Sequence, residues 1–217
     1  PESLEAIFVT HEHQDHINGV ATLSRRYGLP VYANERTMER IKKPRGREIF
    51  KTGQDFSLGS VEVTPFSIIH DAADPVGFAI YAEGFKLCLL TDLGRVTNLV
   101  EEHVRGANAI LLESNHDLEM LQSCSYTWDL KQRIASAHGH LCNEAAGQLL
   151  GGLQGHRQAA ANVGAAVAIV APGLPPQVLR EALARASAGV IIADPDLLPM
   201  ITAALQHHDH DVRLWLT

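Results

Sequence analysis

Cysteine is scarce in this sequence, and no long apolar run is present. The 217 residues include three widely spaced cysteines, Cys88, Cys124 and Cys142, and no C-x-x-C pair. This pattern indicates neither a disulfide framework nor a thiolate zinc site, and a reducing cytoplasm is the expected location. The longest apolar stretch, residues 163–171, is about half as long as a membrane-spanning helix. We therefore expect no membrane span.

A secretory signal and an initiating methionine are also lacking. The chain opens on Pro1, without a charged segment followed by an apolar one, and we expect that the true N-terminus has been removed. The rest of the composition, 46% hydrophobic and 20% charged, is typical of a globular protein long enough to bury a core.

Charge is unevenly distributed along the chain. The net charge is −7, yet residues 36–51 carry a local charge of +5, which leaves −12 for the remainder. The basic residues of this segment are Arg36, Arg40, Lys42, Lys43, Arg45, Arg47 and Lys51. A basic segment on an acidic protein can follow a phosphate backbone, or it can be a solvated helix and loop. Charge alone favours the solvated segment.

Three histidines and an aspartate lie within six residues, immediately after a short apolar stretch that we expect to be a buried strand (residues 6–10). The segment reads Thr10-His11-Glu12-His13-Gln14-Asp15-His16, an H-x-H-x-D-H array. His11 and His13 are two residues apart and can face the same side of an extended chain. Imidazole nitrogen and carboxylate oxygen suit zinc or a similar first-row ion, so the array predicts a metal site.

Hydrophobic periodicity and turn residues predict alternating helices and strands over the first 153 residues. A helix over residues 17–27 is expected to end at Gly28, and Asn34 is expected to cap a helix that runs to about Lys43. The other expected elements are strands at residues 29–33, 60–69, 76–82, 86–91 and 109–112, and helices at residues 97–104 and 143–153.

Beyond Gly155 the sequence becomes rich in alanine and glycine. We expect a metal-binding core over residues 1–155, followed by β-α units over residues 156–217 that complete the same domain or are appended to it. The expected strands cover residues 165–171, 190–193 and 212–216, and the expected helices cover residues 176–186 and 197–205. The turn at residues 172–176 is the best candidate for a boundary.

Two more potential ligands each follow a predicted strand. His70 comes after the strand at residues 60–69, and Asp92 comes after the strand at residues 86–91. Strand ends are where loops gather functional groups. Alone, either residue fits a turn or cap; together with the first array they predict one shared site.

This combination of motifs resembles the metallo-β-lactamase fold superfamily, and within it the YycJ/WalJ-type nucleases, which are related to ribonuclease Z. The resemblance extends over roughly residues 1–153. The matching segments read T-H-E-H at residues 10–13, T-D-L-G at 91–94, L-E-S-N-H-D at 112–117 and G-H-L-C-N-E at 139–144. The resemblance implies an α/β sandwich with αββα layers and a metal-dependent hydrolase, most readily a phosphodiesterase or exonuclease on DNA or RNA.

The resemblance also implies roles for individual residues. One metal would be held by His11, His13 and His70, a second by Asp15 and His16, and Asp92 would bridge the two. Zinc is the expected metal, with manganese as an alternative, and two such ions can clamp the attacking and leaving oxygens of an in-line displacement.

Three side chains would take part in the reaction itself. Asp15 would also orient the attacking water, while Glu113 and His140 would protonate the leaving group. His116 is a weaker candidate, either for contact with phosphate or as a polar residue at the start of a helix.

The sequence departs from this family in two places. It lacks the strands that precede the first metal motif, so we expect an incomplete first sheet. It also lacks the late H-L-S-x-x-N-N segment, whose histidine would complete the second metal position, and we expect that position to be weak. The late cluster at residues 207–210 is interpreted as a solvated loop.

Two other functions remain open from the sequence. A thioester or lactone hydrolase can use the same site, and a degenerate relative can bind one zinc ion, or none, without catalysis. Metal content distinguishes the degenerate relative, whereas activity on nucleic acid against activity on a thioester distinguishes the two enzymes.

Overall fold

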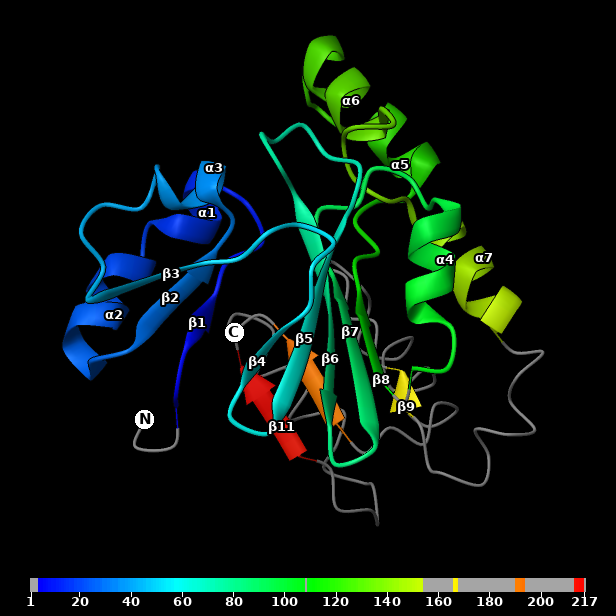
Figure 1. The fold of residues 1–217 in the computed structure, drawn as a ribbon. Coiled ribbons are helices and arrows are strands. Elements are labelled where there is room, and N and C mark those ends of the chain that lie inside the picture. Colours follow the sequence, from blue (N-terminus) through cyan, green and yellow to red (C-terminus); the bar gives the residue numbers. More distant parts are fainter. Residues whose placement is uncertain (1–3, 108, 154–165, 168–189, 194–212, 217) are drawn as a thin grey trace.

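The computed structural model describes residues 4–107, 109–153, 166–167, 190–193 and 213–216. Two sheets form the centre of this part, and helices lie on their outer faces (Figure 1). The elements in chain order are β1 (Ile7–Phe8), α1 (Gln14–Ile17), α2 (Val20–Tyr27), β2 (Pro30–Ala33), α3 (Glu35–Met38), β3 (Gly46–Ile49), β4 (Phe56–Leu58), β5 (Val61–Ser67), β6 (Val76–Ala82), β7 (Phe85–Leu90), α4 (Asn98–Val104), β8 (Ala109–Leu112), α5 (Leu118–Ser123), α6 (Trp128–Ala135), α7 (Asn143–Leu153), β9 (Ala166–Val167), β10 (Val190–Ala193) and β11 (Arg213–Leu216).

The smaller sheet has the strand order β1-β2-β3 and is parallel throughout. The larger sheet has the order β4-β5-β6-β7-β8-β9, antiparallel from β4 to β7 and parallel from β7 to β9. A separate parallel pair joins β10 to β11.

Three apolar clusters separate four layers. Residues of α1, α2 and the α3 region, among them Val20 and Met38, pack on the outer face of the smaller sheet. Phe8 and Tyr32 of that sheet meet Val63 and Phe78 of the larger one, which places an aromatic layer between the sheets. The predicted αββα order therefore begins with one helical layer and two sheets.

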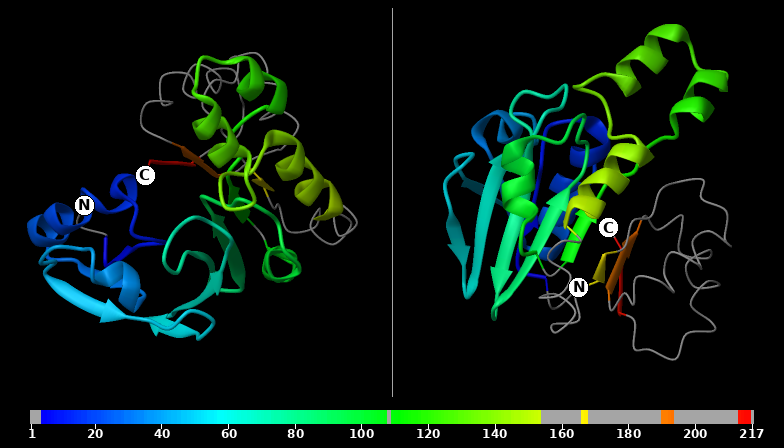
Figure 2. Two further views of the ribbon diagram at one scale, coloured as in Figure 1. Left: turned by 90° about the horizontal axis from the view of Figure 1, so that it is seen from above. Right: turned by 90° about the vertical axis from the view of Figure 1, so that its right-hand side faces the viewer.

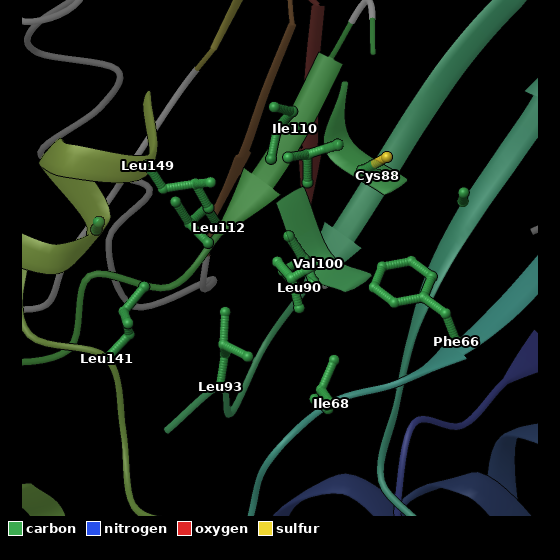
Figure 3. Close-up of a cluster of buried hydrophobic side chains, with 13 residues drawn as sticks. Phe66, Ile68, Cys88, Leu90, Leu93, Val100, Ile110, Leu112, Leu141 and Leu149 are labelled. Carbon is green, nitrogen blue, oxygen red and sulfur yellow. The ribbon is translucent and has the colours of Figure 1, made fainter. Parts of the chain in front are cut away.

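The fourth layer is formed by α4 and α7 on the far face of the larger sheet. Val100 of α4 and Leu149 of α7 belong to one buried cluster with Phe66, Leu90 and Leu112 of the strands (Figure 3). The αββα sandwich expected from the sequence is confirmed. Helices α5 and α6 project away from this body (Figure 2), and α6 has no buried residue.

Several expected elements agree closely with the structure. β6, β8 and α7 have the expected bounds, and Gly28 ends α2 in the left-handed conformation at φ 72°. The Asn34 side chain caps α3 by accepting a hydrogen bond from the backbone N–H of Thr37 at 3.0 Å.

Other expectations were wrong. The helix expected over residues 17–27 is broken between Ile17 and Val20, and the helix expected to reach Lys43 ends at Met38. Lys43 has φ 51° and precedes Pro44, which disfavours helical conformation at the residue before it. Part of the basic segment is a strand, β3, because it pairs with β2.

In the C-terminal part, strands at 190–193 and 213–216 match the expectation, and β9 lies inside the strand expected at 165–171. The expected helices at 176–186 and 197–205, the turn at 172–176 and the histidine cluster at 207–210 lie outside the described residues. The division at residue 155 stays a prediction.

Candidate metal centre

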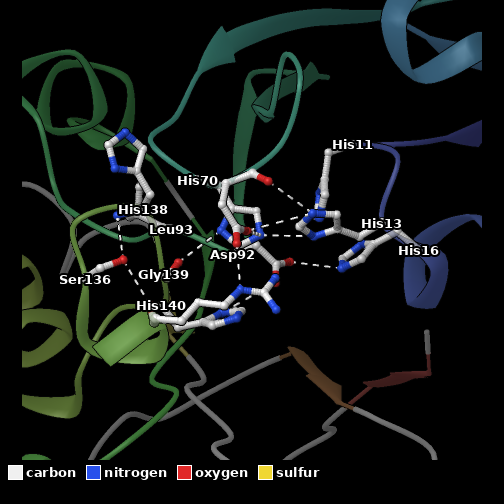
Figure 4. Close-up of polar contacts among 12 residues, drawn as sticks. His11, His13, His16, His70, Asp92, Leu93, Ser136, His138, Gly139 and His140 are labelled. Carbon is white, nitrogen blue, oxygen red and sulfur yellow. Dashed lines mark hydrogen bonds and ion pairs between the residues drawn. The ribbon is translucent and has the colours of Figure 1, made fainter. Parts of the chain in front are cut away.

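The histidines and aspartates singled out from the sequence gather at one edge of the two sheets (Figure 4). His11 and His13 follow β1, His16 lies on α1, His70 follows β5 and Asp92 follows β7. Backbone hydrogen bonds hold these strand ends together: Val76 donates to Thr10 at 3.1 Å and Gly94 donates to Ile69 at 2.8 Å. The ligand candidates are therefore placed by main-chain pairing.

One group of potential ligands consists of His11, His13 and His70. One ring nitrogen of each lies within 4.8 Å of the corresponding atoms of the other two. His13 Nδ1 and His70 Nε2 are 3.3 Å apart. A metal with bonds of about 2.0–2.1 Å to each nitrogen fits between atoms at such separations.

The other ring nitrogens of this group have partners outside it. His11 Nδ1 lies 3.0 Å from Thr10 Oγ1, and His70 Nδ1 lies 3.0 Å from the carbonyl oxygen of Gly139. His13 Nε2 lies 3.3 Å from the carbonyl oxygen of Asp71. Such outer contacts fix the tautomer and direct the second nitrogen of each ring toward a metal.

His11 provides the test of whether a metal fits. Its side chain is fully buried, and its Nε2 has no hydrogen-bond partner among the described residues. A buried polar atom without a partner is costly, and a metal ion at the centre of the three imidazoles would satisfy it. Burial and the neighbouring His16 lower the pKa of His11 to about 4, so the ring is neutral and ready to ligate at pH 7.

Asp92 connects this group to a second one. Its Oδ2 lies 3.0 Å from His16 Nε2, and His11, His16 and Asp92 form another group with ligand atoms within 4.8 Å. Burial alone raises the pKa of Asp92, but the hydrogen bond from His16 and the nearby imidazoles outweigh it and hold the pKa well below its usual range. For His16, burial lowers the pKa, but the contacts with Asp92 outweigh it and raise the pKa.

Asp15 is the one predicted ligand that joins none of these groups. Its side chain is 80% exposed, and its Oδ2 lies 3.6 Å from His16 Nε2. It therefore lies at the rim of the second group, and its role as ligand or water-orienting base stays a prediction.

Glu113 and His140 form the expected pair beside the cluster. Glu113 follows β8, and its Oε2 lies 3.1 Å from His140 Nδ1. Its Oε1 accepts hydrogen bonds from the backbone N–H groups of Leu93 and Leu141. The hydrogen bond that His140 donates to Glu113 raises the pKa of His140, although burial opposes it. Asp92 Oδ1 lies 3.5 Å from the same nitrogen, so the pair adjoins the metal cluster.

Two glycines allow the His140 loop to approach the cluster. A Cβ atom on Gly94 would collide with the carbonyl of Ala137, and a Cβ atom on Gly139 would collide with carbonyls at the end of α6. Only glycine fits at these two positions without a shift of the backbone. His70 and His140 reach a centroid separation of 5.2 Å as a result of this approach.

The family described as "Beta-lactamase superfamily domain" matches residues 1–161. The chain belongs to the β-lactamase superfamily. The membership expected from the sequence motifs is confirmed.

Two curated proteins are closely similar to the chain. Exodeoxyribonuclease YycJ of Bacillus anthracis is 44% identical over 149 residues, which cover 66% of this chain and 56% of the relative. Exodeoxyribonuclease WalJ of Streptococcus pneumoniae is 41% identical over 152 residues, with the same two shares. The chain spans little more than half the length of these relatives.

The fold has a solved counterpart in the metallo-β-lactamase fold protein YhfI from Bacillus subtilis. The TM-score is 0.56 at 16% identity, over 99% of this chain and 75% of that protein. This likeness bears on the fold alone. Among the described residues of the β-lactamase superfamily chain, no helix has the length and apolar character that a membrane span requires.

The structure adds residues that the sequence did not single out. Thr10 Oγ1 lies between His11 and His16, 3.0 and 3.5 Å from their Nδ1 atoms. Asp71 places Oδ1 3.3 Å from His70 Nε2, and its Oδ2 accepts a hydrogen bond from Arg133 Nε at 2.7 Å. The position of Asp71 directly after His70 was a local signal, whereas the contribution of Arg133 from α6 had none.

His140 is also closer to the metal cluster than expected. One of its ring nitrogens lies within 4.8 Å of ligand atoms of His70 and Asp92. His140 can therefore reach a metal as well as a leaving group.

Proposed function

We propose that the chain is the metal-binding core of a metal-dependent phosphodiesterase that removes nucleotides from DNA ends. The names of its relatives, two exodeoxyribonucleases, support this activity. The gathered His and Asp side chains support metal dependence. A nucleic acid is then the expected partner, and the three unpaired cysteines agree with action in a reducing cytoplasm.

The observation that carries the proposal is the Glu113–His140 pair beside the metal cluster. A phosphodiester leaves as an alkoxide, which needs a proton. Glu113, itself held by two backbone N–H groups, accepts a hydrogen bond from Nδ1–H of His140 and stabilises the imidazolium form. The second ring nitrogen of His140 then donates its proton to the leaving oxygen. A thioester needs this pair less, because a thiolate is a weaker base than an alkoxide and can leave without a proton.

The metal would be held by His11, His13 and His70, with Asp92 shared with a second position at His16 and Asp15. Three imidazoles and carboxylates are the ligand chemistry of zinc, with manganese as the alternative. When bound, such an ion supplies Lewis-acid activation of water and of the phosphoryl oxygens. The exposed carboxylate of Asp15 orients the attacking water from the rim of the site. Because the second position has fewer ligands, we expect about one tightly bound ion per chain.

Two variants test this function. His13→Ala should remove both bound metal and hydrolysis of end-labelled DNA, because it deletes one of three neutral ligands. His140→Ala should keep the metal content, measured by elemental analysis, and lower turnover by ~10²–10⁴, the usual range for a lost general acid. Loss of metal in His140→Ala would instead show that His140 is a metal ligand.

The substrate is tested on the wild-type chain with labelled single-stranded DNA, RNA and a thioester. Hydrolysis of DNA alone, or of DNA and RNA, supports the proposal. Hydrolysis of the thioester alone would make the chain a small-molecule hydrolase. Metal binding without hydrolysis of any of the three would make it a non-catalytic zinc protein.

A further inference from the structure

A cavity of about 460 Å³ lies beside the metal cluster, on the side of α4 and α7. Its walls come from these helices and from the loops that follow β7, α6 and β8. His140 lines the cavity and also belongs to the metal cluster, so the two spaces share a wall at the proposed general acid. A volume of this size is typical of a site for a small molecule.

His116, which lines the cavity, has hydrogen-bonding groups with no partner. Both of its ring nitrogens are buried, and neither has a partner among the described residues. Burial and the nearby His140 lower the pKa of His116, so the neutral ring presents one donor and one acceptor. Buried polar atoms in proteins are nearly always paired, so two unpaired ring nitrogens on a residue that lines a cavity indicate a missing polar partner.

The other lining residues include both cationic and apolar side chains. Arg95 and Arg105 line the cavity, and in the described part of the chain neither guanidinium has a carboxylate within ion-pair distance. Glu101 is the one carboxylate among the lining residues, so the lining carries net positive charge. Leu118 and Leu149 provide apolar surface.

We propose that this cavity is a nucleotide subsite, which holds the nucleotide next to the bond that is cleaved. The base lies against the apolar wall, His116 reads a polar edge of the base or sugar, and a flanking phosphate pairs with Arg95 and Arg105. A guanidinium matches a phosphate through two parallel hydrogen bonds. The assignment rests on the proposed phosphodiesterase function, because that function places a nucleotide beside His140.

The arrangement distinguishes a nucleotide from simpler ligands. Inorganic phosphate would use the two arginines and leave His116 unpaired, whereas a nucleoside would pair with His116 and leave the arginines unused. A nucleoside monophosphate uses both, and its affinity should therefore exceed that of either part.

The test measures binding of 2′-deoxyadenosine 5′-monophosphate to the metal-loaded chain by calorimetry, with 2′-deoxyadenosine and inorganic phosphate as the two partial ligands. The Arg95→Ala/Arg105→Ala double variant should weaken binding of the monophosphate by ~10–100-fold, the loss of one charged hydrogen bond or more. Because both arginines are exposed, the variant should fold and keep its metal. His116→Phe should weaken binding of deoxyadenosine and of the monophosphate alike.

Arg26→Ala is the matched control. Arg26 is also exposed, lies on α2 and does not line the cavity, so its loss should leave the dissociation constant unchanged. An equal dissociation constant in wild type and the double variant would overturn the subsite, as would equal affinity for the monophosphate and inorganic phosphate.

Hydrolysis of DNA, measured in parallel, separates the two proposals. If the wild-type chain hydrolyses DNA but the double variant binds the monophosphate as tightly as wild type does, the subsite alone is refuted. Monophosphate binding that depends on both arginines, in a chain that cleaves no nucleic acid, refutes the proposed function and leaves the cavity as a nucleotide-binding site.

Discussion

Replacement of Glu113 by glutamine is the sharpest perturbation of the proposed catalytic pair. The glutamine carbonyl can keep the position of Oε1, which accepts from the N–H groups of Leu93 and Leu141. The amide nitrogen then replaces Oε2 and faces His140 Nδ1, previously 3.1 Å from an acceptor. The imidazolium form of His140 then faces an N–H donor in place of a carboxylate, so one charge-assisted hydrogen bond is lost while two backbone bonds remain.

The cost in stability follows from that one bond. A hydrogen bond to a charged group contributes ~1.5–3 kcal/mol, and Glu113→Gln should lower the free energy of unfolding by about that amount. Because Glu113 raises the pKa of His140, the stabilisation is fully present below the ordinary histidine pKa of ~6.5 and is lost as pH rises through the folded-state pKa. The variant should therefore lose more stability at pH 6 than at pH 9.

The assay is denaturant unfolding of the chelator-treated chain at both pH values, alongside turnover of labelled DNA by the metal-loaded chain. Turnover should fall by ~10²–10⁴, with metal content unchanged. Glu144→Gln, at an exposed position on α7, is the control and should change neither quantity. Equal destabilisation of Glu113→Gln at both pH values would refute the charged pair, and wild-type turnover would refute the general acid.

Three further outcomes test the surroundings of the site. Thr10→Val should weaken metal binding by ~10–100-fold in competition with a chromophoric chelator, whereas Thr10→Ser should not, because the hydroxyl orients both His11 and His16. Gly139→Ala should lower the free energy of unfolding by ~1–3 kcal/mol through collision with α6, whereas Gly147→Ala, which meets no atom within 4 Å, should stabilise α7 by ~0.5–1 kcal/mol in the same unfolding assay. A salt titration of DNA binding should give a shallower slope once three exposed basic residues after α3 are neutralised together, and identical slopes would show that the segment does not follow the phosphate backbone. These residues are Lys42, Lys43 and Arg45.

Elements with a complete apolar pattern could be predicted from the sequence. β6 and β8 are continuous apolar runs, and α7 has an apolar stripe with polar residues on its other face, so local pattern and tertiary packing agree. β3 is formed by a basic segment with three exposed residues, and its strand state depends on pairing with β2, which no local pattern reveals. α6 buries no residue, so packing on the sheets does not account for its helical state.

The candidate site shows the same division between local and long-range information. His11, His13 and His16 lie in one short motif, so their proximity could be predicted from spacing alone. Asp71 and Arg133 meet across 62 residues, and the contact depends on the direction in which α6 leaves the body of the fold. The ion pair between Asp71 and Arg133 could therefore not be predicted from the sequence around either residue.

The site depends on main-chain contacts between strand ends more than on its own side chains. Val76 to Thr10, Gly94 to Ile69 and Glu113 to Leu90 are backbone hydrogen bonds that align the ends of the strands carrying the ligands. Removal of one imidazole leaves these bonds intact, so ligand variants should keep the fold and lose the metal. A substitution at Gly94 or Gly139 acts on the backbone instead, because the added Cβ atom collides with main-chain atoms. It should therefore displace His140 and the cluster together. Metal content and fold are therefore separable by the choice of substitution, which is what makes the proposed roles of the ligands and of His140 open to test.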